Sequence, residues 1–348
     1  RGALKRLIIL ADGTWGSPNS RSPSNVLRLA RACAQRQGKI EQVVFYDWGI
    51  ASESAMGTEA LSGKGIDKNI QDCYRFLVHN YTPGDELFFF GFSRGAYTVR
   101  SLCGLIRNSG LLQSIHANRI QEAYSLYRQR GKSAGPRSNK AAKFRASYCH
   151  ADRTQIHFLG VWDTVGALGI PVPFWGGLGK RHFLFHDTTL SSSVTHARHG
   201  LALDERREDF EPCLWQEKPS VDSKQVWFAG THGDIGGGTK SGFADTSLAW
   251  LAREAQACGL ELIHEGAITH LIDQSARGQH AQPAKLQNSA RGLFALRPKA
   301  SRQIQGAIHR SAVTRHQQDI DSYGRRAQAL SALLLNVDGD WNRLAIEE

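Results

Sequence analysis

Short apolar runs alternate with amphipathic stretches along the first 110 residues. Runs rich in Leu, Ile, Val and Phe predict strands at 5–11, 42–48 and 85–92. Apolar residues at helical spacing predict helices at 25–35, 65–80 and 96–108. This alternation is typical of a parallel sheet that is covered by helices on both faces.

The pattern continues less regularly in the second half of the chain. Further strands are predicted at 155–162 and 225–229, and further helices at 195–207 and 247–259. The remaining stretches are predicted to be an exposed loop at 131–143, a structured loop rich in Pro, Gly and aromatic residues at 170–179, and an irregular segment at 275–300. No internal repeat and no clear domain boundary interrupt the pattern.

A G-x-S-x-G motif follows the third predicted strand and opens the next helix. Its residues are Gly91, Phe92, Ser93, Arg94 and Gly95. A strand, a tight turn and a helix in this order form a nucleophile elbow, which lifts the serine hydroxyl above the sheet edge. We therefore expect Ser93 to be a catalytic nucleophile and the chain to be a single α/β-hydrolase-like domain, residues 1–348. Its core would span about 5–260, with a basic helical or irregular part at about 261–348.

A serine nucleophile needs a base, and His232 is the best candidate among the histidines. It follows the last predicted strand and lies in the glycine-rich sequence GTHGDIGGG. In this fold the triad runs in the order serine, acid, histidine. His182 and His186 are separated by four residues but have no third ligand, so they are interpreted as surface residues.

The acid that orients this histidine has two candidates, and the sequence leaves both open. Asp163 ends the strand that lies between the serine and histidine strands in the chain. Asp204 precedes His232 at a place that also fits the triad order. A carboxylate at either position can reach an imidazole and hold its orientation.

Two backbone segments are candidates for an oxyanion hole. The N–H of Arg94 follows the nucleophile, and the loop after the first strand offers those of Gly13 and Thr14. Asp12, Asp163 and Asp234 also end strands, so a metal site stays open as an alternative, because hard cations prefer carboxylates. The hydrolase interpretation itself needs neither a metal nor a cofactor.

Several sequence blocks together resemble a known family. They are, in order, ADGTWGS, GFSRGAYTVRSLCGLI, FLGVWDTVGALG, HARHGLALDERREDFEP, VWFAGTHGDIGGG and IHRSAVTR. They resemble the uncharacterised bacterial and fungal α/β-hydrolases that include the type VI secretion phospholipase effectors of the first lipase class, from about residue 5 to about 315. The resemblance implies an ester hydrolase acting on lipids, with Ser93 and His232 in the catalytic roles.

The substrate is therefore expected to be a lipid or another ester. Large apolar residues in the segment 172–185, among them Phe174 and Trp175, are predicted to contact an acyl chain or a membrane surface. An esterase of small soluble or carbohydrate esters and a catalytically dead binding module remain alternatives. The intact set of serine, histidine and acidic residues argues against the second of these.

The net charge of +11 comes from two local stretches. Residues 128–145 carry seven Lys and Arg, and residues 277–315 carry eight, both without an acid. These surfaces are interpreted as solvated loops or as sites that meet anionic lipid. No nucleic-acid motif accompanies the charge, and the sequence does not indicate a protein partner.

Cysteine spacing and hydropathy bear on where the protein is made and whether it spans a membrane. The six cysteines show no metal spacing, so we expect reduced thiols and synthesis in the cytoplasm. We find no signal peptide and no apolar run long enough to span a membrane, which leaves non-classical secretion open.

Overall fold

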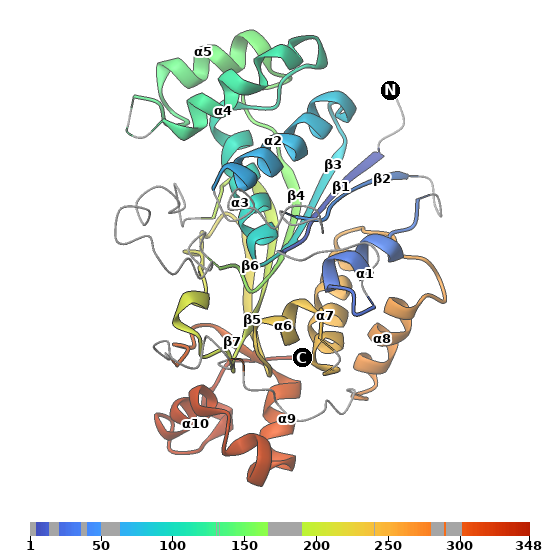
Figure 1. The fold of residues 1–348 in the computed structure, drawn as a ribbon, viewed down its shortest axis with the longest axis vertical. Helices are drawn as coiled ribbons and strands as arrows, with labels where there is room; N and C mark the ends of the chain where they lie inside the picture. Colours follow the sequence, from blue (N-terminus) through green and yellow to red (C-terminus); the bar gives the residue numbers. More distant parts are fainter. Residues whose placement is uncertain are drawn as a thin grey trace.

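One parallel sheet organises the chain in the computed structural model, which describes residues 5–13, 21–35, 40–49, 63–129, 131, 133–165, 190–239, 241–279, 289 and 301–348. Its strands are β1 (Lys5–Ala11), β2 (Glu41–Asp47), β3 (Glu86–Phe92), β4 (Ile156–Trp162), β5 (Val194–Ala202), β6 (Asp222–Phe228), β7 (Ala307–His309) and β8 (Ile346–Glu347). They pair in the order β2-β1-β3-β4-β5-β6-β7-β8, and each described pair is parallel (Figure 1).

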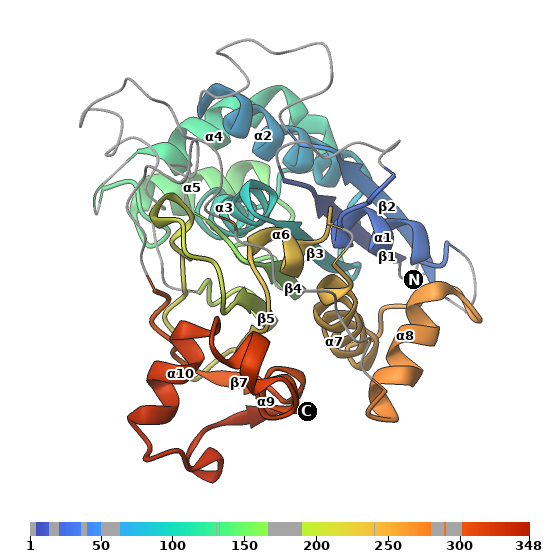
Figure 2. The same cartoon turned by 60° about the horizontal axis from the view of Figure 1, so that its bottom comes forward.

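Helices pack against both faces of the sheet (Figures 1 and 2). The first face carries α2 (Gly63–Asn80), α3 (Arg94–Ser109), α4 (Ile120–Arg128) and α5 (Asn139–Tyr148). The second face carries α1 (Asn25–Ala32), α6 (His232–Gly236), α7 (Phe243–Ala257) and α8 (Ala267–Ala276). The C-terminal helices are α9 (Arg310–Gln318) and α10 (Gln328–Leu335). Shorter helical turns are Ser114–Arg119, Glu208–Phe210, Ile320–Gly324 and Trp341–Arg343.

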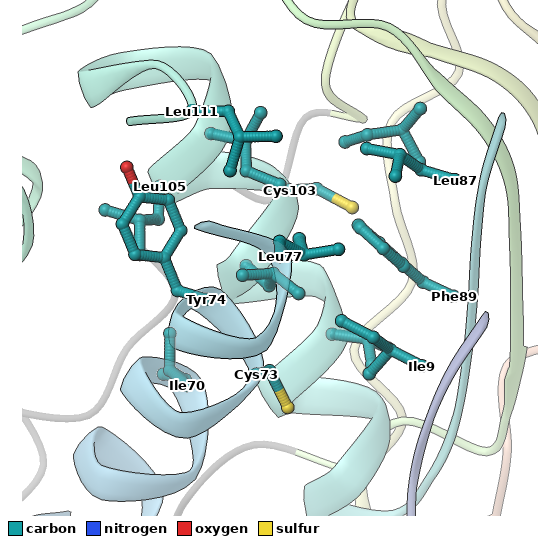
Figure 3. Packing of buried hydrophobic residues seen from close by; sticks show 14 of the residues in the cluster. Ile9, Ile70, Cys73, Tyr74, Leu77, Leu87, Phe89, Cys103, Leu105 and Leu111 are labelled. Carbon is teal, nitrogen blue, oxygen red and sulfur yellow. The ribbon is translucent and has the colours of Figure 1, made fainter. Parts of the chain in front are cut away.

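The central strands bury side chains on both faces. In β1, Leu7 and Ile9 join the core under α2 and α3, whereas Ile8 and Leu10 join the core under α1 and α7. Figure 3 shows the first of these cores, where side chains of β1 and β3 meet those of α2 and α3. A strand with two buried faces needs a continuous apolar run, which explains the sequences of β1 and β3.

Most predicted elements are confirmed, but the helix predicted at 195–207 is wrong. That stretch belongs to β5 and the turn after it. Arg198 is buried there because its guanidinium lies 2.7 Å from Asp222 Oδ2 and also contacts Glu254 of α7. A buried strand is identified from its run of apolar residues. In β5 this run is interrupted by polar residues whose partners lie on neighbouring elements.

Two further regions differ from the sequence-based expectation, and one predicted loop lies outside the described residues. The loop predicted at 131–143 ends earlier, since α5 begins at Asn139. The predicted loop at 170–179 lies outside the described residues. The sheet also extends beyond the expected core, because β7 and β8 add two short strands from the C-terminal part.

The strand order reverses between β1 and β3, and the carboxyl ends of the strands at this point form a candidate ligand site. The chain first builds outward from β1 to β2 and then returns to place β3 on the other side of β1. Ligands of open α/β sheets bind at the carboxyl ends of the strands, where the order reverses in this way. The turn after β3 is at this point, and it contains Ser93.

Candidate active site

Ser93 occupies a tight turn between β3 and α3. Its backbone has φ 57° and ψ −119°, a conformation that non-glycine residues rarely adopt and that is found at strained functional turns. The turn is this tight because Gly91 and Gly95 have no side chains. A Cβ on Gly95 would lie 2.0 Å from the Ala11 carbonyl oxygen, and a Cβ on Gly91 would lie 2.5 Å from that of Gly95.

His232 faces this serine from the first residue of α6. Its Nε2 lies 2.9 Å from Ser93 Oγ. The ring packs between Phe92 and Phe210, whose centroids lie 4.7 and 4.9 Å from its own. The backbone N–H of His232 donates to Glu205 Oε2 at 3.2 Å. The two aromatic contacts restrict the ring, and the hydrogen bond holds the backbone of His232.

Asp163 lies on the far side of the imidazole, directly after β4. Its Oδ2 is 2.6 Å from His232 Nδ1, and its Oδ1 accepts the N–H of Ala202 at 3.1 Å. A guanidinium nitrogen of Arg302 donates to the same Oδ2 at 3.2 Å. The side chains of Ser93, His232 and Asp163 thus form one hydrogen-bonded row.

The environment of Asp163 keeps its carboxylate ionised. Complete burial raises the pKa of this carboxyl, but the charge of Arg302 and the hydrogen bond to His232 outweigh it and bring the pKa to about 2. A carboxylate ionised at neutral pH is what an imidazole needs if it is to become positively charged in this row.

Asp204, the other candidate acid, is placed differently. Its Oδ2 accepts the N–H of Gly230 at 2.7 Å and the hydroxyl of Tyr323 at 3.0 Å. Burial raises its pKa to about 7. Asp204 therefore supports the segment that leads to His232 and joins it to the C-terminal part, while Asp163 is the carboxylate bonded to the ring.

Of the candidate oxyanion donors, Arg94 and Gly13 lie among the described residues. The N–H of Arg94 belongs to the first turn of α3, where N–H groups have no acceptor within the helix. Gly13 lies beside the nucleophile, since a Cβ on Gly13 would be 3.2 Å from Ser93 Cβ. Its N–H, however, donates to Asp12 Oδ1 at 2.8 Å. Thr14 lies outside the described residues, as do Phe174 and Trp175.

The three aspartates of the metal alternative have separate surroundings. Asp12 accepts the hydroxyl of Tyr46 at 2.7 Å, and Asp234 accepts the N–H of Thr231 at 3.0 Å. Asp163 belongs to the row with His232. Within the described ranges, no three His, Cys, Asp or Glu side chains are grouped as metal ligands would be. All six cysteines are unpaired thiols.

Two residues near the row were missed by the sequence analysis. Glu205 accepts the N–H of His232 and binds Arg207 at 2.9 Å. Its neighbour Asp204 is a candidate acid from the sequence, but no motif marks Glu205 itself. Arg302 approaches from a basic stretch interpreted as surface, and no sequence signal connects it with Asp163.

Arg302 offers a test through the pH dependence of activity. Removing its charge in Arg302→Met takes away the cation that lowers the pKa of Asp163, so the Asp163–His232 pair should hold its proton to higher pH. We expect the acid limb of the kcat/KM profile to move upward by about one pH unit. Arg302→Lys, which keeps the charge, should move it less. Identical limbs in all three proteins would show that Arg302 has no electrostatic effect on the pair.

The parallel sheet, the elbow at Ser93 and the row behind it define an α/β-hydrolase-like protein. The chain belongs to the family described as "T6SS, Phospholipase effector Tle1-like, catalytic domain", whose family model matches residues 5–254. This confirms the resemblance seen in the sequence blocks.

Individual relatives share part of their length with this chain. The uncharacterized protein YEL023C of Saccharomyces cerevisiae is 28% identical over an alignment of 238 residues, and the match covers 62% of this chain and 33% of that protein. A solved structure of an uncharacterized Pseudomonas aeruginosa protein has 16% identity and a TM-score of 0.43, and the match covers 75% of this chain and 47% of that chain. The Tle1 effector bound to the VgrG spike of the Type 6 secretion system has 19% identity and a TM-score of 0.40, with 70% and 52% covered. The chain thus spans about a third of the curated relative and about half of each solved chain.

Hydropathy adds one further observation. In the described part of the chain, each helix is too short or too polar to serve as a bilayer-spanning segment.

Proposed function

We propose that this chain is the catalytic domain of a serine hydrolase that cleaves acyl esters of phospholipids. The observation that carries the proposal is the hydrogen-bonded row of Ser93, His232 and Asp163, with N–O distances of 2.9 and 2.6 Å. Membership in a family of phospholipase effectors supports a lipid as the substrate.

In the proposed mechanism, the Ser93 hydroxyl attacks the ester carbonyl and His232 Nε2 takes its proton. The imidazolium then gives this proton to the leaving alcohol, and water hydrolyses the acyl-enzyme with the same base. Asp163 stays ionised throughout, which keeps Nδ1–H directed at its Oδ2 and stabilises the imidazolium.

The oxyanion would be held at the start of α3. The Arg94 N–H supplies the first donor, and the loop after β1 supplies the second. The Gly13 N–H donates to Asp12 Oδ1, so Gly13 would have to give up that hydrogen bond to act as this donor. Each such donor contributes roughly 3 kcal/mol of transition-state stabilisation. Ser93 and His232 are both buried, so these interactions act with little competition from water.

The substrate preference can be tested by comparing an aggregated with a soluble ester. We expect a higher kcat/KM on vesicles of a long-chain anionic phospholipid than on 4-nitrophenyl butyrate, because exposed basic residues attract anionic headgroups. Such residues include Arg137, Lys140 and Lys143 on and before α5.

Salt separates this attraction from the chemistry. Raising the salt concentration from about 0.05 to about 0.5 M should lower vesicle hydrolysis several-fold and leave the soluble ester unaffected. If the soluble ester is preferred and salt has no effect on vesicles, the chain is an esterase of small soluble esters instead.

A further inference from the structure

Among the described residues, buried arginines are matched by carboxylates, with one exception. Five arginines are buried among the described residues: Arg6, Arg94, Arg145, Arg198 and Arg302. Four of them have a carboxylate oxygen within 3.2 Å. Arg94 has no ion pair with any described residue, although only 5% of it is exposed.

The guanidinium of Arg94 is also short of hydrogen bonds. Its Nη1 is buried and has no acceptor in the described part of the chain. Burial lowers the pKa of this group to about 10, and no carboxylate in the described ranges opposes that effect. A buried cation without a partner is costly, so the fold retains at this position a charge that no carboxylate of the described residues neutralises.

The position of Arg94 places this charge at the candidate active site. Arg94 directly follows Ser93 and is the first residue of α3, a helix of 16 residues. Side chains on a helix lean toward its N-terminus, so that of Arg94 leans toward the end at which Ser93 lies. The helix dipole makes the same end favourable for an anion. Ser93 itself is 8% exposed, so both consecutive residues of this turn are buried.

We propose that the Arg94 guanidinium binds the phosphate of the substrate headgroup and thereby makes the site selective for acyl esters that carry a phosphate. This inference rests on the proposed function, because it assigns the substrate of the same site. In a glycerophospholipid the phosphate and the acyl esters are attached to one three-carbon backbone, so a cation one residue from the nucleophile is suitably placed. A guanidinium matches a phosphate with two parallel N–H···O bonds.

The experiment compares two lipids that differ only in the phosphate headgroup. A phosphatidylcholine and the diacylglycerol with the same acyl chains are presented in the same mixed detergent micelles, and kcat/KM is measured for both. We expect the wild-type chain to prefer the phospholipid, and Arg94→Gln to lower the ratio of the two values by about 10- to 100-fold. Arg94→Lys, which keeps the charge without the paired geometry, should give an intermediate ratio.

Two controls separate a specific loss from damage to the fold. Arg107→Gln removes a positive charge from the last turn of the same helix and should leave the ratio unchanged. Labelling of Ser93 by a fluorophosphonate reports whether the elbow is intact in Arg94→Gln. Equal losses on both lipids in a labelled variant would overturn the proposal, since the guanidinium would then act on the ester itself or on the fold.

A second arm distinguishes a lipid headgroup from a free phosphate. Inorganic phosphate is added to wild type and Arg94→Gln during hydrolysis of 4-nitrophenyl butyrate, and we expect neither to be inhibited at millimolar concentration. Inhibition of the wild type alone, with an unchanged lipid ratio, would assign Arg94 to a free anion and overturn the headgroup assignment. If neither lipid is hydrolysed by the wild type, the proposed function fails rather than this inference alone.

Discussion

Replacing Ser93 with alanine is expected to lower kcat for ester hydrolysis by roughly 10⁵- to 10⁶-fold. The variant lacks the proposed nucleophile, while His232, Asp163 and the proposed backbone donors remain in place. The fold should survive, because the turn already holds a small side chain and, within the part of the chain that the structure describes, its hydroxyl bonds only His232. Thermal unfolding within a few degrees of wild type would check this.

Fluorophosphonate labelling supplies the matched measurement for this variant. The wild-type chain should be labelled and the alanine variant should not, whichever ester proves to be the better substrate. A labelled and active Ser93→Ala protein would remove the serine-hydrolase mechanism altogether.

Changing Asp163 to asparagine should lower turnover by about 10⁴-fold with little change in structure. Asparagine has nearly the same shape, but its amide no longer fixes the tautomer of His232, whose Nδ1 lies 2.6 Å from Asp163 Oδ2. It also carries no charge to stabilise the imidazolium. The measurement is kcat on the preferred ester, with fluorophosphonate labelling rates as a second readout.

Asp204→Asn is the control for this change, since both residues are buried aspartates. Its carboxyl contacts Gly230 and Tyr323, and its pKa of about 7 already allows a neutral form near neutral pH. We therefore expect less than about a tenfold loss of kcat. Should Asp204→Asn be the more damaging substitution, the assignment of Asp163 as the acid is wrong.

The sequence predicted the central sheet well, because its strands are buried on both faces. Four residues of β1, from Leu7 to Leu10, are 0% exposed and are all apolar, which leaves little ambiguity. In β5, by contrast, Arg198 is buried by pairing with Asp222 and Glu254. A pattern of apolar residues does not reveal burial that depends on partners elsewhere in the chain.

The sequence predicted the site residues that belong to short motifs. It left undecided those whose contacts come from distant parts of the chain. Gly91 and Gly95 around Ser93, and Gly237 after His232, lie close to other backbone atoms, so these glycines belong to short sequence motifs. Which carboxylate meets His232 depends on how the strand ends are brought together, and both Asp163 and Asp204 satisfied the chain order. The approach of Arg302 to Asp163 involves residues 139 positions apart, for which a single sequence offers no signal.

The row of contacts around His232 also has a consequence for the order in which the protein becomes functional. Its hydrogen bonds join residues 139, 69 and 139 positions apart along the chain. Contacts of such long range require extensive loop closure and form late, after local helices and neighbouring strands. On the proposed mechanism, a growing polypeptide has no working nucleophile before residue 232 has emerged, and its acid lacks the arginine partner until residue 302 has followed. On that mechanism, nascent fragments that end before residue 232 are inert even though they contain the complete serine motif.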